Sequence, residues 1–282
     1  MTFDYKQADK VLELSFASAE RPGASLTFPK PGTLSDAMAK LLGAHPDGTP
    51  VVPYQDRSLF ASAGVEMWHR AIHSFLWSVA LTTASPLWAS VCGYYASHFI
   101  MRAYAHSLGF FKSFAKSEIV QVTMVGPNFV CSRLDVGSKQ RGEHSFYWKV
   151  VKKYPDYLGN NLFRENSERD PSSESAHRTF ANYTDHLSSF RGIDNFAIDK
   201  VAQQVDKISR IRRDSVVPPT REAFPDLQNV QIIAFQRIVE FQDFLDSRVG
   251  ANRFWNAHRR PAWCRNQMIY QVEEQYIEVG DP

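Results

Sequence analysis

Apolar side chains recur at helical spacing in the stretch Ser85–Gly109, and the rest of the chain is organised around it. The first stripe follows alternating steps of four and three residues and comprises Leu87, Val91, Tyr94, His98, Met101, Ala105 and Leu108. A second stripe beside it comprises Trp88, Cys92, Tyr95, Phe99 and Ala103. Two adjoining stripes predict a helix buried over a wide arc, as at the centre of a bundle. Pro86 suits its first turn, Ser85 is a candidate N-cap, and Gly109 stands where helices commonly end.

Helical spacing also appears on both sides of this stretch. Residues 63–84 predict a helix that packs antiparallel to the next one, because the connecting turn is short. Further helices are predicted at His177–Phe190, around Ile198–Ile208 and at Leu227–Leu245, and a short one at Ser35–Leu42. Four or more long helices in two hairpins predict a mainly α fold, a helical bundle.

Alternating and β-branched positions predict strands in two places. Ser117–Val125 and Phe129–Val136 flank Gly126-Pro127-Asn128, a good turn, and predict a β-hairpin. Val11–Ser18 and Ala24–Phe28 also have strand character.

The domain organisation follows from these elements. We expect a small mixed α/β region over residues 1–60 and a helical bundle over residues 61–282. The bundle carries a β-hairpin and loop insertion at about 115–175. The first region would serve as a lid, an edge hairpin or a partner-binding arm, and the pattern does not choose among these.

Composition narrows the class of protein. The contents of 44% hydrophobic and 22% charged residues are ordinary for a soluble globular chain. A formal charge of +2 excludes a protein that is basic overall, so nucleic acid would have to be bound by local patches. Three well-separated cysteines form no disulfide or zinc pattern, which favours a reducing, cytoplasmic location. The N-terminus lacks the apolar segment of a signal peptide.

The sequence also favours neither a membrane span nor a cofactor site. No Asp, Glu, Lys or Arg occurs from Ala71 to Met101, but Pro86 divides this run, which predicts a buried hairpin rather than a membrane span. Phosphate-loop, dinucleotide and nucleophile-elbow motifs are absent, so we expect no cofactor. Glu66, His69 and His73 share one helical face, but without a second Glu-x-x-His motif the pattern predicts no metal site.

Several residues of the central stretch resemble a known family. They are Tyr94, Tyr95, Ala96, Phe99, Arg102, Ala103 and Gly109. Their order is similar to the second helix of HEPN-type domains, and Ile208–Ser215 is similar to that family's end-of-helix segment, with Ser215 in the place of a tyrosine. The resemblance implies a HEPN-like bundle, a homodimer, and binding of RNA or nucleotides. It also implies metal-independent RNA cleavage in catalytic members, and a role in microbial defence or toxin systems.

Arg253 and His258 are the candidate catalytic residues. The family's ribonucleases carry Arg, four to six residues, and then His, and Arg253–His258 is the literal instance of that spacing. Histidine supplies a general acid or base near neutral pKa, and arginine offsets the charge of a phosphorane. The alternative is that both are surface residues of a turn.

Two basic segments are candidates for RNA or phosphate binding. The first comprises Lys207, Arg210, Arg212 and Arg213. These cations either bind phosphate or complement the C-terminal dipole of their helix. The second, Arg141–Tyr154, interleaves lysines with aromatic residues, which either stack on unpaired bases or pack as an amphipathic helix against the bundle.

Two functions from different classes therefore stay open. The first is a HEPN-like protein that acts on RNA or nucleotides, and the candidate activity is that of a metal-independent endoribonuclease. The second is a non-catalytic helical subunit or adaptor that binds a protein partner.

Overall fold

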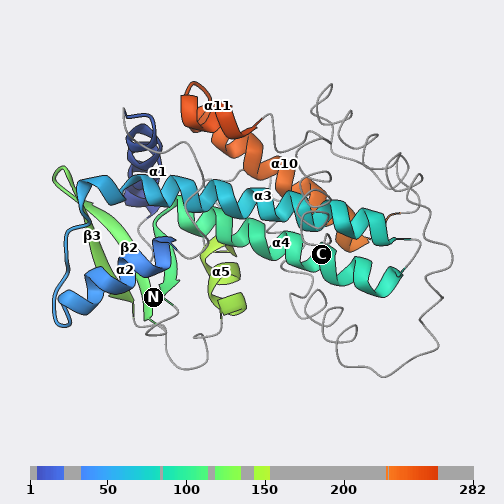
Figure 1. The fold of residues 1–282 in the computed structure, drawn as a ribbon, viewed down its shortest axis with the longest axis horizontal. Helices are drawn as coiled ribbons and strands as arrows, with labels where there is room; N and C mark the ends of the chain where they lie inside the picture. Colours follow the sequence, from blue (N-terminus) through green and yellow to red (C-terminus); the bar gives the residue numbers. More distant parts are fainter. Residues whose placement is uncertain are drawn as a thin grey trace, which may run out of the picture. The chain divides into compact units, whose positions relative to one another are not determined.

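The computed structural model describes residues 5–21, 33–82, 85–113, 118–134, 143–152, 227 and 229–259 (Figure 1). The helices are α1 (Tyr5–Ala19), α2 (Thr33–Ala44), α3 (Ser58–Leu81), α4 (Pro86–Ser107), α5 (Glu143–Lys152), α10 (Asn229–Val249) and α11 (Arg253–Arg259), with a 3-10 turn η1 (Tyr54–Asp56). The strands are β1 (Phe110–Ser113), β2 (Glu118–Val125) and β3 (Asn128–Leu134). The described chain is thus mainly helical with one small sheet, as the hydrophobic pattern predicts.

Contacts divide the chain into two compact units. Among the described residues, the first unit runs to Trp68, resumes at His98 and includes Asp243–Asn256. The second unit contains His69–Ser97, the chain from 229 to Gln242, and residues 257–259. Helices α3, α4 and α10 contribute residues to both units, so each unit is described by itself.

The sheet of the first unit is antiparallel with strand order β1-β2-β3. Val122 pairs with Cys131 and Val125 pairs with Asn128, and Gly126 has a φ of 59° in the turn between the strands. The predicted hairpin is therefore confirmed. Strand β1 was not predicted: Gly109, with a φ of 79°, ends the α4 segment and its carbonyl accepts the Val122 N–H at 2.8 Å.

Helix α2 and the start of α3 cover this sheet and close the core of the first unit (Figure 1). The core residues are Val11, Leu34, Met38, Leu42, Val52, Phe60, Ala63, Phe111, Val120, Val122, Phe129 and Cys131. The predicted short helix at Ser35–Leu42 is confirmed by α2. The chain before η1 joins the sheet edge, where the Val52 N–H donates to the Phe129 carbonyl at 2.8 Å.

The strand predicted at Val11–Ser18 is wrong, because this segment lies within helix α1. Burial in α1 follows helical steps of three and four residues over the whole helix, whereas the apparent alternation covers only the eight residues from Val11 to Ser18. The buried side chains are Ala8, Val11, Leu12, Ser15, Phe16, Ser18 and Ala19. Ser15 and Ser18 are tolerated on the buried face because their hydroxyls donate to backbone carbonyls of the same helix. Ser15 Oγ, for example, donates to the Leu12 carbonyl at 2.9 Å. The second predicted strand, Ala24–Phe28, lies outside the described residues.

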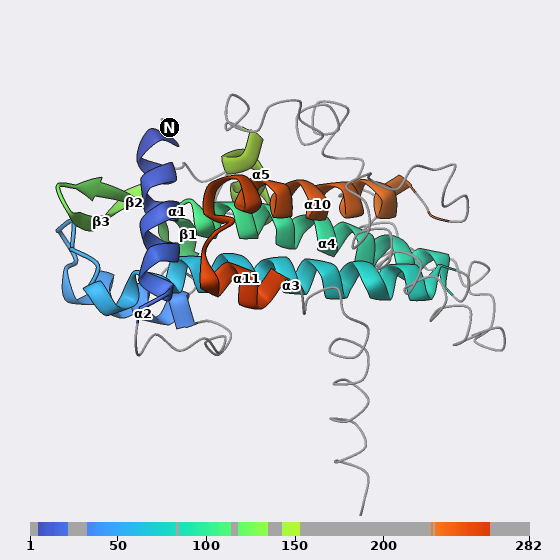
Figure 2. The same ribbon diagram turned by 90° about the horizontal axis from the view of Figure 1, so that it is seen from above.

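Helices α3, α4 and α10 confirm the corresponding predicted helices. In the second unit, Ser78 Oγ donates to the Ala89 carbonyl at 2.6 Å and joins α3 to α4. Gln231 of α10 donates to the Ser78 carbonyl at 2.7 Å. In the first unit α10 again contacts α4, where the rings of Tyr104 and Phe244 lie 5.0 Å apart (Figure 2).

Of the two stripes predicted for α4, the first is buried from Val91 onward, whereas the second is buried only at Ala103. Val91, Tyr94 and Met101 of the first stripe are buried, whereas Trp88 of the second stripe is exposed and Phe99 is half-buried. The second buried line is instead Ala89, Gly93, Ala96, Ile100, Tyr104 and Ser107. Gly93 fits this line because a β-carbon there would lie 3.3 Å from Ser78 Oγ of α3 and 3.4 Å from Val230 Cγ1 of α10, a closeness that hydrophobicity alone does not reveal.

Two further predictions concern the basic aromatic segment and the membrane. Helix α5 buries Phe146, Tyr147 and Val150, which favours the amphipathic-helix interpretation over base stacking for these aromatics. Within the part of the chain that the structure describes, no helix has the length and hydropathy needed to cross a membrane.

Candidate functional site

The two predicted catalytic residues lie on one short helix, α11, and the four predicted phosphate contacts lie outside the described residues. Arg253 is the first residue of α11 and is exposed, whereas His258 is near its end and is half-buried. The four predicted phosphate contacts outside the described residues are Lys207, Arg210, Arg212 and Arg213. The site is therefore built from α11 and the residues that contact it within each unit.

Side-chain hydrogen bonds hold the start of α11 in the first unit. Asn252 is its N-cap, because Asn252 Oδ1 accepts the Trp255 N–H at 3.0 Å. The same side chain donates to the Phe16 carbonyl at 3.0 Å. The Trp255 ring lies 5.0 Å from the Trp68 ring and is buried. The Arg253 N–H donates to the Glu20 carboxylate, so the backbone of Arg253 is fixed while its side chain reaches solvent.

His258 contacts a second histidine in the second unit. Nε2–H of His69, on α3, donates to the His258 backbone carbonyl at 3.1 Å. The two imidazole rings lie 5.8 Å apart in an edge-to-face arrangement. Both side chains are half-buried.

Burial keeps His69 neutral. The pKa of His69 is lowered to about 4, mainly because burial desolvates the charged ring. The hydrogen bond to the His258 carbonyl acts in the opposite direction, and the charge of His258 adds to the lowering. Because Nε2 carries the donated proton, Nδ1 of His69 is the acceptor nitrogen of the neutral ring. The site thus places a neutral imidazole of known tautomer against His258.

The same face of α3 continues into an aromatic pair. Trp77 Nε1 donates to His73 Nε2 at 3.0 Å, and burial lowers the pKa of His73. The Trp77 side chain is 42% exposed. His69, His73 and Trp77 follow one another at four-residue steps, so they form one stripe along α3.

Arg253 and His258 leave α11 in different directions. Each residue of an α-helix turns the side-chain direction by about 100° around the helix axis. Two side chains that are five positions apart therefore point in directions that differ by roughly 140°. A single copy of α11 therefore does not direct both side chains to one point.

Buried histidines of the first unit have a packing role. His106 Nε2 lies 3.4 Å from Tyr147 Oη, which also accepts the Lys112 N–H at 3.3 Å. Burial, with a contribution from Arg102, lowers the pKa of His106 to about 3. Neutral His106 and Tyr147 therefore join α4 to α5 and the sheet. His98, which the sequence pattern places in the core, is also buried and lies 6.2 Å from the Tyr147 ring.

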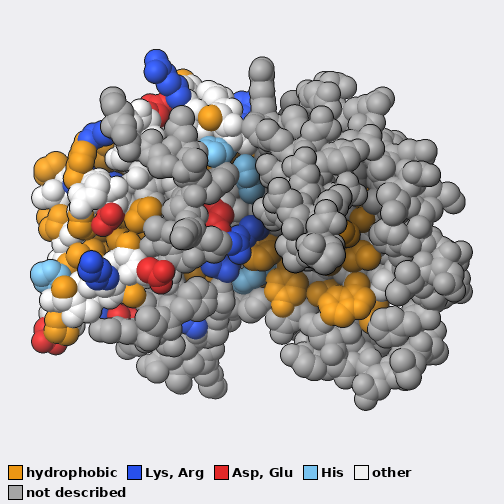
Figure 3. Space-filling model, viewed as in Figure 1, with side chains coloured by type: hydrophobic (Ala, Val, Ile, Leu, Met, Phe, Trp, Pro, Cys, Tyr) orange, Lys and Arg blue, Asp and Glu red, His pale blue; other side chains and the backbone are white. Residues whose placement is uncertain are grey.

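The described side chains offer no metal centre. No group of three or more His, Cys, Asp or Glu residues in the described ranges is arranged to hold a metal ion. On the face drawn in Figure 3, described acidic and basic side chains are interspersed.

Sequence reasoning missed the partnership of His69 with His258. The two residues are 189 positions apart, so no local motif connects them.

Comparisons with family models, with curated proteins and with solved structures each found no match.

Proposed function

We propose that this chain is a HEPN-like, cytoplasmic protein that acts on RNA or nucleotides as a metal-independent endoribonuclease in a microbial defence or toxin system. Arg253 and His258 are its catalytic residues in this proposal. Lys207, Arg210, Arg212 and Arg213 are its phosphate contacts. The observation that supports the proposal is the contact of His258 with a neutral, half-buried histidine.

The chemistry needs three groups. Cleavage of RNA without metal requires a base that takes the proton of the attacking 2′-hydroxyl, an acid that protonates the leaving 5′-oxygen, and a cation near the phosphorane. His258 supplies the acid or base, and Arg253 supplies the cation. His69 acts through His258 as a positioning residue, since it is bound to the His258 backbone and is held neutral.

The direction of the two side chains on α11 favours a homodimer. One helix does not aim Arg253 and His258 at the same phosphate, because they leave it roughly 140° apart. Two copies of α11 that face each other would supply the arginine of one protomer and the histidine of the other. The solution mass of the purified protein tests this part of the proposal, and a monomer at all concentrations contradicts it.

Incubation of the purified protein with cellular RNA in EDTA tests the activity. We expect cleavage by the natural sequence and a rate at least about 100-fold lower for His258→Ala and Arg253→Ala, because general acid–base and electrostatic contributions are of that size. His45→Ala is the matched control, since His45 is an exposed histidine far along the chain from α11. An absence of cleavage, or equal rates for all variants, contradicts the proposal.

The pH profile tests the positioning role of His69. His69→Phe keeps a ring of similar size and removes the donor to the His258 carbonyl. We expect the pH of half-maximal rate to move, because the surroundings of His258 change. A lower rate with an unchanged profile would assign His69 to folding alone.

Two exposed tryptophans favour the second candidate function, a non-catalytic subunit or adaptor. Trp77 near the end of α3 and Trp88 at the start of α4 are 42% and 46% exposed. They lie within Ala71–Met101, which has no charged Asp, Glu, Lys or Arg. Exposed tryptophan in a segment without charged side chains is typical of protein interfaces. Co-purification in a stable complex that Trp77→Ser and Trp88→Ser weaken, without any ribonuclease activity, would support this function.

A further inference from the structure

Two arginines of the first unit converge on one exposed aromatic ring. The guanidinium carbon of Arg21, just after α1, lies 4.0 Å from the centroid of the Tyr54 ring. The guanidinium carbon of Arg57, just after η1, lies 4.9 Å from the same centroid and 5.0 Å from that of Phe129. Tyr54 is 49% exposed. Cations stack on aromatic faces, so the ring holds both guanidinium groups in place before any ligand arrives.

Within the described ranges, neither positive charge is balanced by an acid. Among the described residues, no carboxylate oxygen lies within 4.0 Å of the guanidinium nitrogens of Arg21 or Arg57. The carboxylate of Glu20, beside Arg21 in the sequence, accepts the Arg253 N–H instead. Burial and the charge of Arg21 lower the pKa of Arg57, the direction expected when two like charges are close.

The donors of Arg57 are also incompletely used. Its Nη2 donates to Asn128 Oδ1 at 3.4 Å, which is long for a hydrogen bond. Its Nε is buried and has no hydrogen-bond acceptor among the described residues. An unsatisfied buried N–H is costly, so Arg57 lacks the full set of acceptors that a purely structural arginine would have.

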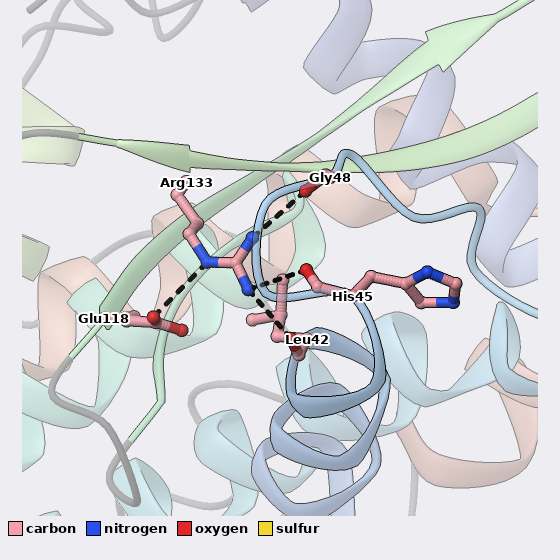
Figure 4. Close-up of polar contacts among 5 residues, drawn as sticks. All are labelled: Leu42, His45, Gly48, Glu118 and Arg133. Atoms are coloured by element: carbon pink, nitrogen blue, oxygen red, sulfur yellow. Dashed lines mark hydrogen bonds and ion pairs between the residues drawn. The ribbon is translucent and has the colours of Figure 1, made fainter.

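Arg133, in the same unit, shows how a structural arginine is satisfied here (Figure 4). Its Nε contacts Glu118 at 3.3 Å, and its Nη1 donates to the Gly48 carbonyl at 3.0 Å. Its Nη2 donates to the carbonyls of Leu42 and His45 at 2.8 and 3.1 Å, at the end of α2. The group therefore has a carboxylate and three carbonyls, whereas the described structure provides Arg21 and Arg57 with no such set.

We propose that Arg21, Tyr54 and Arg57 form a binding site for a phosphate monoester, the doubly charged group that ends a nucleotide or an RNA strand. Two guanidinium groups match the charge of the dianion, and their planar forks match its oxygens. A singly charged phosphodiester or carboxylate would leave one cation unbalanced. The site does not depend on the histidine pair at α11, so binding and cleavage fail or succeed separately.

Calorimetric titration tests the site with four probes: inorganic phosphate, a nucleoside monophosphate, a short RNA with a 5′-phosphate, and the same RNA without it. We expect phosphate and at least one of the two monoesters to bind, and the unphosphorylated RNA to bind at least about tenfold more weakly than its 5′-phosphorylated form, since a lost charge-assisted contact is of that size. Preference for the monophosphate identifies a free nucleotide as the source, and preference for the phosphorylated RNA identifies a strand end. Equal affinity for both RNAs, with no binding of phosphate or monophosphate, overturns the proposal.

Variants separate binding from folding. Arg57→Gln and Arg21→Gln should each weaken phosphate binding by about tenfold or more. Arg57→Lys keeps the positive charge but should retain only part of the phosphate affinity, because lysine lacks the planar fork of arginine. Lys40 is an exposed lysine of α2, so Lys40→Gln is the control. This variant should bind phosphate as the natural sequence does. Unchanged binding in folded Arg21→Gln and Arg57→Gln variants would assign both arginines to packing.

The pH dependence gives a readout that a purely structural role would not produce. The second pKa of a phosphate monoester is about 6, whereas arginine stays charged, so affinity should rise between about pH 5 and 7. Sulfate is a dianion throughout this range, so its affinity should stay constant. A monoester affinity that does not change with pH contradicts recognition of the dianion.

Discussion

Helices α3 and α4 approach each other closely at Gly64 in the first unit, and this contact allows a quantitative prediction. A β-carbon at Gly64 would overlap Ser107 Oγ and would lie 3.3 Å from both the Ala103 carbonyl oxygen and Ser107 Cβ. Gly64→Ala therefore forces the two helices or the serine to move. The packing of α3 against α4 matters for the candidate site, because α3 carries His69.

Two opposing effects set the size of the change. Overpacking of a tight contact costs about 1–3 kcal/mol. Alanine is a better helix former than glycine, which returns up to about 1 kcal/mol. We therefore expect Gly64→Ala to lower the free energy of unfolding by roughly 1–2 kcal/mol.

Ser107→Ala should remove most of this cost. Ser107 Oγ is buried and has no hydrogen-bond partner among the described residues, so its loss alone should change stability little. In the double variant Gly64→Ala/Ser107→Ala the overlapping oxygen is gone. The propensity gain remains, and the double variant should be about as stable as the natural protein.

Urea unfolding followed by circular dichroism measures these changes as a double-mutant cycle. Gly43→Ala is the matched control, because no atom lies within 4 Å of a β-carbon placed there. That control should be as stable as the natural protein or up to about 1 kcal/mol more stable. The reasoning is refuted if Gly64→Ala costs nothing, or if Ser107→Ala leaves its cost unchanged.

Three further predictions concern polar side chains that hold helices in place. Folded His106 has a pKa of about 3, below its unfolded value of 6.5, so the unfolded chain binds more protons between these values and stability should fall as pH drops through that window. His106→Gln should flatten the slope by up to about 1.4 kcal/mol per pH unit in pH-dependent urea unfolding, and an unchanged slope contradicts this. Gln231→Ala removes the donor to the Ser78 carbonyl and Thr82 Oγ1, and should lower the free energy of unfolding by about 1–3 kcal/mol in the same assay. A change near zero would show that water replaces the Gln231 amide. Arg133→Met should cost about 2–4 kcal/mol and increase amide exchange at the end of α2, where unaltered protection would show that the cap is dispensable.

Elements with a strong local signal were predicted well. Helices α2, α3, α4 and α10 follow a helical hydrophobic period, and the β2–β3 hairpin has a glycine turn between two β-rich runs. These features depend on neighbouring residues, whose preferences act within a few positions.

The errors occur where the local signal fits two structures. In α1, alternation over Val11–Ser18 is also compatible with a helix, and the wider burial pattern decides for the helix. In α4, large apolar residues such as Trp88 indicated a buried stripe, but the buried line contains small residues such as Gly93. Close helix packing favours small side chains, and which face is close depends on the partner helix.

The sequence by itself determined the mainly helical class, the central helix at Ser85–Gly109 and the candidate histidine His258. Only the tertiary structure decided that His258 meets His69, and that Arg21 and Arg57 meet at Tyr54. The physical reason is range: helical period and turn preference act between neighbours in the chain, whereas burial, charge balance and pKa depend on groups brought together by folding.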